Sequence, residues 1–360
     1  MNNRFKLYFV LICIICQHLI SCQESPKNIF LGLNTEVINF ERSETLSGKQ
    51  VLVENFGATN LHIIDTFIIF MTPQLDSLYS IVSTETYNHL GNFVNRGNGP
   101  SELLYSLEPL SAQKDGNDVA MSLYDFHNRK LIDFNLTKSV DMQFPIFKEN
   151  NSIKPMSGIY KVHKLDDEFL FVDYLNIGDL TQHYAKYHFA SNELVNDFEA
   201  LTSGILDQSL SYLLAASTSF NSQKMKYVSA MKFIDQINFY EIDDPQKSKS
   251  FSVNKNSAKM VEVERTPMPD RMEYYVDLRS DSSFVYGLYV NQNRKDWALN
   301  EKPGVIQVFD WHGNPICELI TEEKLIYFDI DSKNKRLYGM TIEEDLFVYD
   351  LKGIDYLNQH

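Results

Sequence analysis

Cysteine is scarce in this chain: its 360 residues include four, Cys13, Cys16, Cys22 and Cys317. Three of them fall within the first 22 residues, so only Cys317 belongs to the long remainder. A disulfide within the remainder is therefore excluded unless Cys22 keeps a free thiol, and stability has to come from a hydrophobic core. Material for a core is plentiful, because the chain has 24 Phe and 20 Tyr.

Long hydrophobic runs and an excess of positive charge are also missing. An apolar run at residues 7–16 is too short to cross a bilayer as a helix, and no later run reaches that length. Without residues 1–21, 31 Lys and Arg face 48 Asp and Glu, a formal charge near −17. This balance argues against nucleic acid as a partner, because phosphate binding needs a basic surface.

The motifs of common catalytic and metal sites are absent as well: the sequence has no HExxH, no paired CxxC and no GxSxG. Cys13 and Cys16 form a lone CxxC in an apolar segment, which lacks the electropositive setting that activates thiols. Residues 329–334 are acidic but lack the glycine and closing glutamate of a calcium loop, and a β-turn is the better interpretation. We therefore expect no metal, no cofactor and no catalytic residue that the sequence can name.

The N-terminal segment has the organisation of a bacterial lipoprotein signal. Arg4 and Lys6 precede the apolar run, and the sequence Leu-Ile-Ser-Cys that ends at Cys22 resembles a lipobox. A plain secretory signal would end in a small-x-small site, and none is as well placed. We expect residues 1–21 to be removed, Cys22 to carry lipid, and residues 22–34 to act as a tether. The protein would then be lipid-anchored in the cell envelope, at the periplasmic or the surface face of the outer membrane.

A short pattern recurs along the rest of the chain: an aromatic, a polar and an apolar residue, followed by a turn. The copies lie 40 to 69 residues apart and begin at Tyr79, Tyr124, Tyr187, Tyr240, Phe309 and Tyr349. Strand-like runs rich in aromatic and β-branched residues flank them. Gly313 and Gly353 lie in two of the turns, where we expect positive φ. Six copies at this spacing predict six four-stranded blades of a β-propeller.

The expected fold class is all-β, with residues 35–360 forming one six-bladed propeller. Residues 35–40 alternate like a strand but have no blade of their own, so we expect them to pair into the last blade and close the ring. Asp207, as an N-cap before leucines at helical spacing, predicts a small helical insertion near residues 207–216. A sandwich of two sheets is the alternative architecture.

Three segments resemble a known family, the Bacteroidota lipoproteins described as TolB-like and six-bladed propeller-like. Residues 89–103 resemble its G-x-G-R-G-P-G-E-F segment, residues 305–320 its penultimate-blade hairpin, and residues 325–351 its terminal blade. Asn98 and Ser101 depart from the family pattern. The resemblance implies a propeller in an outer-membrane or surface setting, and it implies no agreed activity.

The loop at residues 96–102 is the best candidate for a ligand site. Its glycines would bring backbone N–H groups close to an anion, and Arg96, Asn98 and Glu102 add polar side chains. It is not a P-loop, because no Gly-Lys-Ser or Gly-Lys-Thr ends it. The alternative is a connector between blades, in which glycine and proline set the direction of the chain.

A second group of residues is also able to line the mouth of a channel. Tyr274 and Tyr275 lie near Arg271 and Arg279 in the sequence, and aromatic rings beside cations suit a sugar or another planar ligand. Aromatic residues in strands pack in the core more often than they bind ligands.

Three hypotheses of function follow. The first is a lipid-anchored propeller without catalytic activity that binds a glycan or an envelope protein. The second is a propeller-type carbohydrate hydrolase or lyase, which requires two carboxylates facing each other across the channel, one with a raised pKa. The third is a structural tether, which predicts no concave polar pocket.

Overall fold

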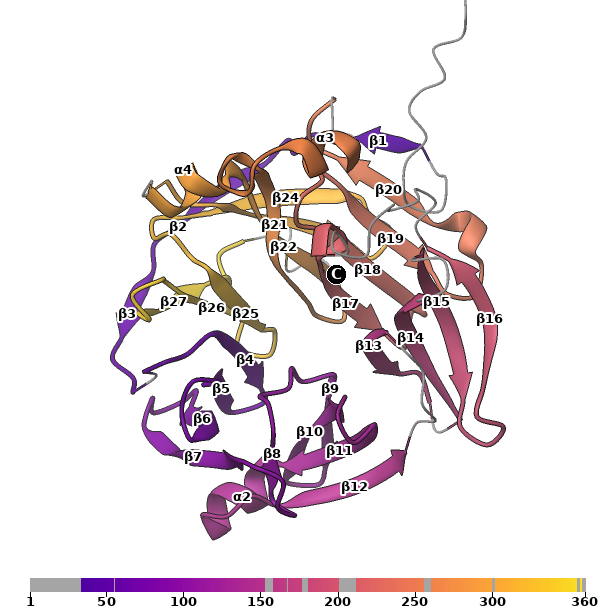
Figure 1. The fold of residues 1–360 in the computed structure, drawn as a ribbon. Coiled ribbons are helices and arrows are strands. Elements are labelled where there is room, and N and C mark those ends of the chain that lie inside the picture. The colour runs from indigo at the N-terminus through magenta and orange to yellow at the C-terminus, as the bar shows by residue number, and fades with distance from the viewer. Residues whose placement is uncertain are drawn as a thin grey trace, which may run out of the picture.

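The structure is a computed structural model that describes residues 34–54, 56–152, 158–166, 168–176, 181–200, 212–255, 260–299, 302–354 and 357. Six small sheets surround a central axis (Figure 1). Apart from the strands added from the N-terminal part of the chain, the strand nearest to the axis is the one that comes first in the sequence of each sheet. The chain is therefore the six-bladed β-propeller that the repeat predicts. The predicted signal, Cys22 and the tether up to residue 33 lie outside the described residues.

Blades one to three are built from consecutive antiparallel strands, except that the two-residue β8 pairs parallel with β7. The first blade contains β4 (Asn60–Ile64), β5 (Phe67–Met71), β6 (Ser77–Ser83), β7 (His89–Arg96) and β8 (Glu102–Leu103). The second contains β9 (Ser111–Asp115), β10 (Asp118–Asp125), β11 (Lys130–Asn135) and β12 (Phe147–Ser152). The third contains β13 (Ile159–Lys164), β14 (Phe169–Asn176), β15 (Thr181–His188) and β16 (Glu193–Glu199).

Blades four to six each take one further strand from the N-terminal part of the chain. The fourth contains β17 (Ala216–Asn221), β18 (Lys226–Met231), β19 (Ile237–Glu241), β20 (Lys249–Ser252) and β1 (Thr35–Val37). The fifth contains β21 (Met272–Ser280), β22 (Phe284–Asn293), β23 (Val305–Asp310), β24 (Pro315–Thr321) and β2 (Ser43–Leu46). The sixth contains β25 (Tyr327–Asp331), β26 (Arg336–Met340), β27 (Leu346–Asp350) and β3 (Lys49–Val51).

Residues 35–51, which we call the N-terminal strap, run along the outer edges of these three blades. β1 pairs parallel with β20, β2 pairs parallel with β24, and β3 pairs antiparallel with β27. A strand from the N-terminus therefore closes the ring, but the position predicted for it, residues 35–40, is wrong. The fourth blade already has four strands when β1 reaches it, whereas the sixth has three, so β3 completes the sixth blade.

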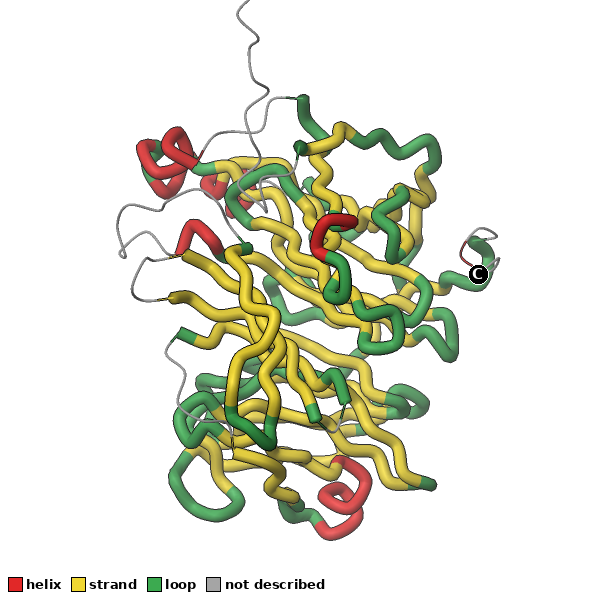
Figure 2. Tube along the Cα trace, turned by 90° about the vertical axis from the view of Figure 1, so that its right-hand side faces the viewer, coloured by secondary structure: helices red, strands yellow, loops and turns green. Residues whose placement is uncertain are grey.

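Several strands are buried along their whole length, because a neighbouring blade covers each face of the sheet. All residues of β5 and β18 are buried. The short helices α2 (Leu136–Met142), α3 (Met260–Arg265) and α4 (Arg294–Leu299) lie at the edges of the sheets (Figure 2). Within the described ranges, no helix has the length and apolar character needed to cross a membrane.

Aspartate side chains cap several of the hairpin turns. Asp125 Oδ1 accepts hydrogen bonds from the backbone N–H groups of residues 127 and 128, and Asp310 Oδ1 accepts from those of residues 312 and 314. Asp331 Oδ1 accepts from the N–H of Asn334. Residues 332–335 form this turn, whereas residues 329–331 belong to β25, so the predicted β-turn covers only the second half of the segment 329–334. The carboxylates of Asp329 and Asp331 hold backbone and amide groups.

The two turn glycines differ. Gly313 has φ +81°, and a Cβ atom there would lie 2.3 Å from the ring of Phe251, so both backbone conformation and space require glycine. Gly353 does not adopt positive φ and faces open space, so that prediction is wrong. The predicted helix near residues 207–216 falls mostly outside the described residues; residues 212–214 form one 3₁₀ turn before β17.

Candidate functional site

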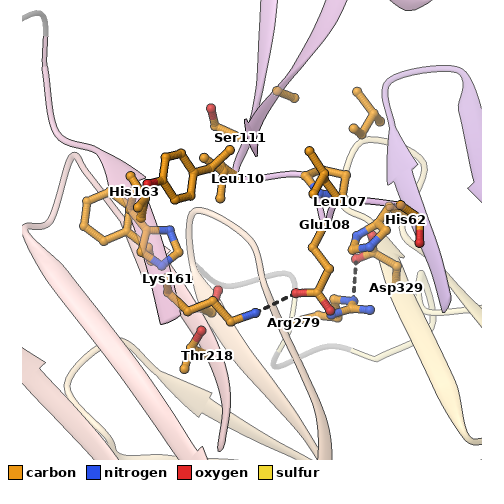
Figure 3. Close-up of a pocket in the computed structure, with 18 of the residues that line it drawn as sticks. His62, Leu107, Glu108, Leu110, Ser111, Lys161, His163, Thr218, Arg279 and Asp329 are labelled. Atoms are coloured by element: carbon orange, nitrogen blue, oxygen red, sulfur yellow. Dashed lines mark hydrogen bonds and ion pairs between the residues drawn. The ribbon is translucent and has the colours of Figure 1, made fainter. Parts of the chain in front are cut away.

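A cavity of about 530 Å³ lies at the centre of the ring, and we call it the central cavity. The innermost strand of every blade contributes to its wall: β4, β9, β13, β17, β21 and β25. Residues 103–112, which connect the first blade to the second, also line it. Its charged and polar lining residues include His62, Glu108, Lys161, His163, Thr218, Arg279 and Asp329 (Figure 3).

An exposed ion pair spans part of this cavity. Glu108, on the connector, accepts a hydrogen bond of 2.7 Å from the Nζ of Lys161 on β13 (Figure 3). The two side chains are 48% and 32% exposed. Burial works to raise the pKa of Glu108, but the charges of Lys161 and Arg279 outweigh it, and the pKa falls to about 2. Glu108 is therefore charged at neutral pH, and both partners are open to a ligand.

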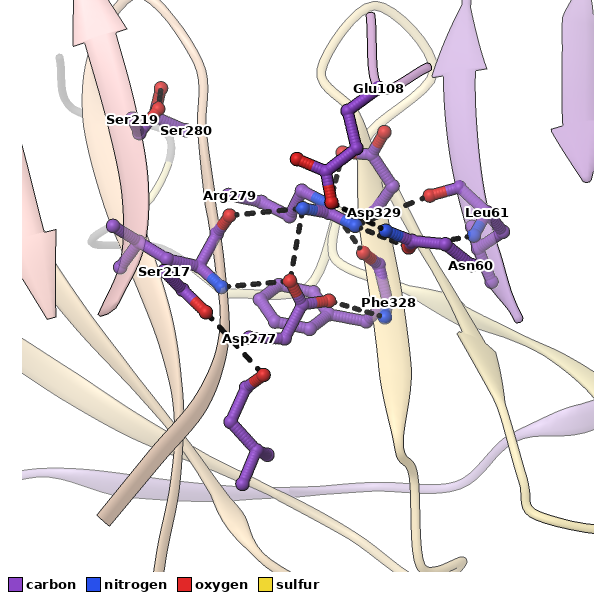
Figure 4. A network of polar contacts seen from close by, with 12 residues as sticks. Asn60, Leu61, Glu108, Ser217, Ser219, Asp277, Arg279, Ser280, Phe328 and Asp329 are labelled. Carbon is purple, nitrogen blue, oxygen red and sulfur yellow. Dashed lines mark hydrogen bonds and ion pairs between the residues drawn. The ribbon is translucent and has the colours of Figure 1, made fainter. Parts of the chain in front are cut away.

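Arg279 also lines the cavity, but most of its guanidinium is already engaged by the protein. It donates to the carbonyls of Phe328, Leu278 and Leu61 and to the Asn60 side-chain oxygen, and it forms an ion pair of 2.9 Å with Asp277 (Figure 4). These partners belong to the first, fifth and sixth blades. Arg279 thus joins three blades through contacts that are made within the protein.

Asp329 is held in the same way. Its Oδ2 accepts the N–H of Ile63 at 2.7 Å, its Oδ1 accepts the N–H of Ile330 at 2.8 Å, and Arg279 Nε lies 3.9 Å from Oδ1. Burial raises the pKa of Asp329 to about 6, against the opposing charge of Arg279. Asp329 therefore connects the sixth blade to the first at the point where the ring closes.

Two buried histidines face the cavity with unsatisfied ring nitrogens. His62 is 8% exposed and His163 is 7% exposed, and they lie on opposite sides of Glu108 (Figure 3). Among the described residues, His62 Nε2 and both ring nitrogens of His163 have no hydrogen-bond partner. Burial, assisted by Arg279 for His62 and by Lys161 for His163, lowers each pKa to about 3, so both rings are neutral. Buried polar groups without partners are rare in proteins, and a bound ligand would supply partners here.

Aromatic rings and hydroxyl groups complete the lining. Tyr105 and Phe126 are 63% and 49% exposed, which is unusual for large apolar side chains. Phe126 meets the ring of Tyr124 edge-on at 4.8 Å. On the other side, Ser219 and Ser280 share a hydrogen bond. The cavity therefore combines open aromatic faces with neutral hydrogen-bonding groups.

A second cavity of about 130 Å³ adjoins the first, and we call it the side cavity. It shares Lys161 and Thr218 with the central cavity. Asp173 lines it and is 2% exposed. The Asp173 carboxylate accepts hydrogen bonds from the Gln182 side chain at 2.6 Å and from the Tyr227 hydroxyl at 2.9 Å. Burial raises the pKa of Asp173 to about 6.

The loop predicted as a ligand site lies outside both cavities: none of Arg96, Asn98 and Glu102 lines either of them. The Glu102 carboxylate accepts the N–H of Gly99 at 2.8 Å, and a Cβ atom on Gly97 would collide with it. Arg96 donates to the carbonyls of residues 73 and 104. The loop's own side chains thus hold its backbone in place, which fits the connector interpretation. Its ligand role stays a prediction.

The structure separates the second group, and Tyr274 and Tyr275 pack in the core, as the alternative interpretation expects. Arg271 is 6% exposed and donates to the carbonyls of Val263 and Thr266. Tyr275 is 1% exposed, and its hydroxyl donates to Gln307 at 2.7 Å. Arg279 is the one member that reaches the central cavity.

No sequence motif marks five of the residues at these cavities: His62, Glu108, Lys161, His163 and Asp173. One signal was available for two of them: a polar residue between two apolar neighbours in the first strand of a blade, such as His62 in β4 and Lys161 in β13. Innermost strands line the channel of a propeller, so these positions are where polar residues would face a ligand.

Comparison with known proteins finds no family model that matches this chain and no curated protein that matches it.

Proposed function

We propose that this protein is a lipid-anchored binding protein of the bacterial cell envelope, and that its central cavity holds a saccharide. The observation that carries the proposal is the cavity itself: about 530 Å³, bordered by all six innermost strands, with the Glu108–Lys161 pair open to it. Ligand sites in proteins have this size and this concave form.

The mixed lining is the reason for a saccharide. A sugar ring has apolar C–H faces and hydroxyl edges, so it needs both aromatic surfaces and hydrogen-bonding groups. Tyr105 and Phe126 offer exposed rings, and Glu108, Lys161 and Thr218 offer donors and acceptors. Arg279 has little to offer an anionic ligand, because four hydrogen bonds and an ion pair already tie its guanidinium to the protein.

Binding is favoured over hydrolysis by the state of Asp329. The cavity does hold two carboxylates with divergent pKa values, Asp329 at about 6 and Glu108 at about 2, which is the pattern of an acid and a base. However, each oxygen of Asp329 already accepts a backbone N–H. A general acid needs an oxygen that is turned to the substrate, and Asp329 instead holds two blades together.

The support for a lipid anchor comes from the sequence. The lipobox at Cys22 and the resemblance to Bacteroidota TolB-like lipoproteins both support an anchor in the outer membrane. A soluble acidic body on such an anchor would present its cavity in the envelope, where glycans are abundant. Several acyl chains hold a protein stably at a membrane, whereas one chain does so only marginally.

Replacement of Cys22 by Ala will abolish lipid attachment, because the thiol is the acceptor. Cells fed an alkyne-labelled fatty acid should label the wild-type protein and leave the Cys22→Ala protein unlabelled. A Cys317→Ala variant is the control and should label normally, because Cys317 is buried. Equal labelling of the Cys22→Ala protein would contradict the anchor.

Replacement of Lys161 by Met should weaken saccharide binding by about tenfold or more, because it removes a charged hydrogen-bond donor worth about 1.5–3 kcal/mol. The measurement is titration calorimetry of the wild-type protein against a panel of mono- and disaccharides. Lys186→Met is the matched control, since Lys186 pairs with Asp243 and lines neither cavity.

Two results would contradict the proposal. One is an empty panel, in which no saccharide binds the wild-type protein. The other is a saccharide whose affinity is equal in the Lys161→Met and Lys186→Met proteins, because binding would then occur elsewhere. Analysis of the same mixtures for cleaved products separates binding from hydrolysis.

A further inference from the structure

The charges around the two cavities are unequal. The central cavity is lined by the carboxylates of Glu108, Asp125 and Asp329 and by the cations Lys161 and Arg279. The side cavity adds the carboxylate of Asp173 to the shared Lys161. Four carboxylates thus face two cations, and a ligand carrying positive charge would restore the balance.

Asp173 is a buried carboxylate without a cationic partner among the described residues. No Lys, Arg or His nitrogen of the described residues lies within 4 Å of it, and both of its hydrogen bonds come from neutral groups. The ammonium of Lys161, which also lines the side cavity, is paired with Glu108 instead. A buried charge without a counter-ion is costly unless something pairs with it.

We propose that the side cavity receives a primary ammonium group of the bound ligand, with Asp173 as its counter-ion. The ligand of the central cavity is then an amine-bearing saccharide. This inference rests on the proposed function, because the saccharide ring would occupy the central cavity while its amine reaches past Lys161 and Thr218, the residues common to both cavities.

The size and walls of the side cavity fit a substituent. Its volume of about 130 Å³ is a quarter of that of the central cavity, which is room for a small group rather than a second ring. Leu214, Ala215 and Ala216 form its apolar side, and the Asp173 carboxylate is its charged group. In such surroundings an ammonium–carboxylate contact is strengthened by the low local dielectric.

The experiment compares four probes by titration calorimetry: D-glucosamine, D-glucose, N-acetyl-D-glucosamine and putrescine. The first three share one ring and differ in the group at one carbon, whereas putrescine offers ammonium groups without a sugar. We expect D-glucosamine to bind the wild-type protein at least about tenfold more tightly than D-glucose or N-acetyl-D-glucosamine. Asp173→Asn should remove this preference and keep the side-chain shape.

Asp243→Asn is the matched control, because it removes the same charge from an exposed carboxylate that lines neither cavity. It should keep the preference for D-glucosamine. Circular dichroism of both variants checks that the fold is retained.

The pH dependence of D-glucosamine binding gives an independent test of the ammonium site. Burial places the pKa of Asp173 at about 6, so the carboxyl is neutral below that pH and charged above it. Lys161, Gln182, Tyr184 and Tyr227 are the polar groups that act on it, and the tyrosines stay protonated in this range. The preference for D-glucosamine should therefore grow between about pH 5 and pH 7 in the wild-type protein and stay flat in Asp173→Asn.

The outcomes separate this inference from the proposed function. Equal affinities for D-glucosamine and D-glucose overturn the ammonium site and leave the saccharide function standing. Binding of putrescine alone, lost in Asp173→Asn, supports the ammonium site and contradicts a saccharide ligand. A preference that survives Asp173→Asn, or no binding of any amine probe, overturns the inference; the wider saccharide panel then decides the proposed function.

Discussion

A chain that begins at residue 52 will show no cooperative unfolding transition, whereas one that begins at residue 35 will unfold in a single sharp step. The deletion removes the N-terminal strap, and with it the outer strands β1, β2 and β3. Blade six is left with three strands and an exposed edge along β27. The lost free energy of unfolding should exceed the 5–15 kcal/mol that typically stabilises a domain.

The reason for so large an effect is that the strap also carries core residues. Leu46 packs in the hydrophobic cluster of the fifth and sixth blades, and Ile38 in that of the fourth and fifth. Both are less than 8% exposed. Thermal unfolding followed by near-ultraviolet circular dichroism measures the outcome. A shortened chain that melts within a few degrees of the longer one would show that ring closure does not depend on the strap.

Replacement of Arg279 by Met will lower the free energy of unfolding by about 3–5 kcal/mol, the usual cost of removing one partner of a buried ion pair. The side chain of Arg279 is 14% exposed, and that of Asp277, its partner at 2.9 Å, is 6% exposed. Without the guanidinium, the Asp277 carboxylate loses its counter-ion. The Asn60 side chain and the Phe328 carbonyl also lose a donor.

Urea denaturation of the two proteins measures this difference, and Arg129→Met is the control. Arg129 is exposed in the turn before β11, so its replacement should change the free energy of unfolding by less than about 0.5 kcal/mol. Asp277→Asn together with Arg279→Met should cost less than the sum of the two single changes, because the pair is coupled. A loss below about 1 kcal/mol for Arg279→Met would contradict its role in joining three blades.

The repeat predicted the blades because its information is local. Each copy combines a strand, a turn and a second strand within a few residues, as in Phe309-Asp310-Trp311 followed by Gly313. Ring closure is different, because the partner of an edge strand lies far away in the sequence. β3 is the three-residue strand Lys49–Val51, mostly exposed, with no alternating apolar pattern. Nothing in its sequence marks it as the closing strand, whereas residues 35–40 have the more strand-like pattern.

The residues of the central cavity could not be predicted for the same physical reason, because they lie far apart in the sequence. Its lining residues run from His62 to Asp329 and come from every blade, so no spacing in the sequence connects them. Glu108 lies in a connector without regular structure, where a single glutamate is unremarkable. The loop at residues 96–102 had the glycines typical of an anion site, but its own Glu102 accepts the N–H that an anion would bind. The amino-acid composition of a loop cannot show that one of its own side chains already accepts its backbone N–H groups.

The most direct test of the central claim is a crystal structure of this protein with the best-binding saccharide. We predict electron density for the sugar ring in the central cavity, within hydrogen-bond distance of Glu108 or Lys161 and against Tyr105 or Phe126. A saccharide bound at residues 96–102, or anywhere else outside the central cavity, would contradict the account.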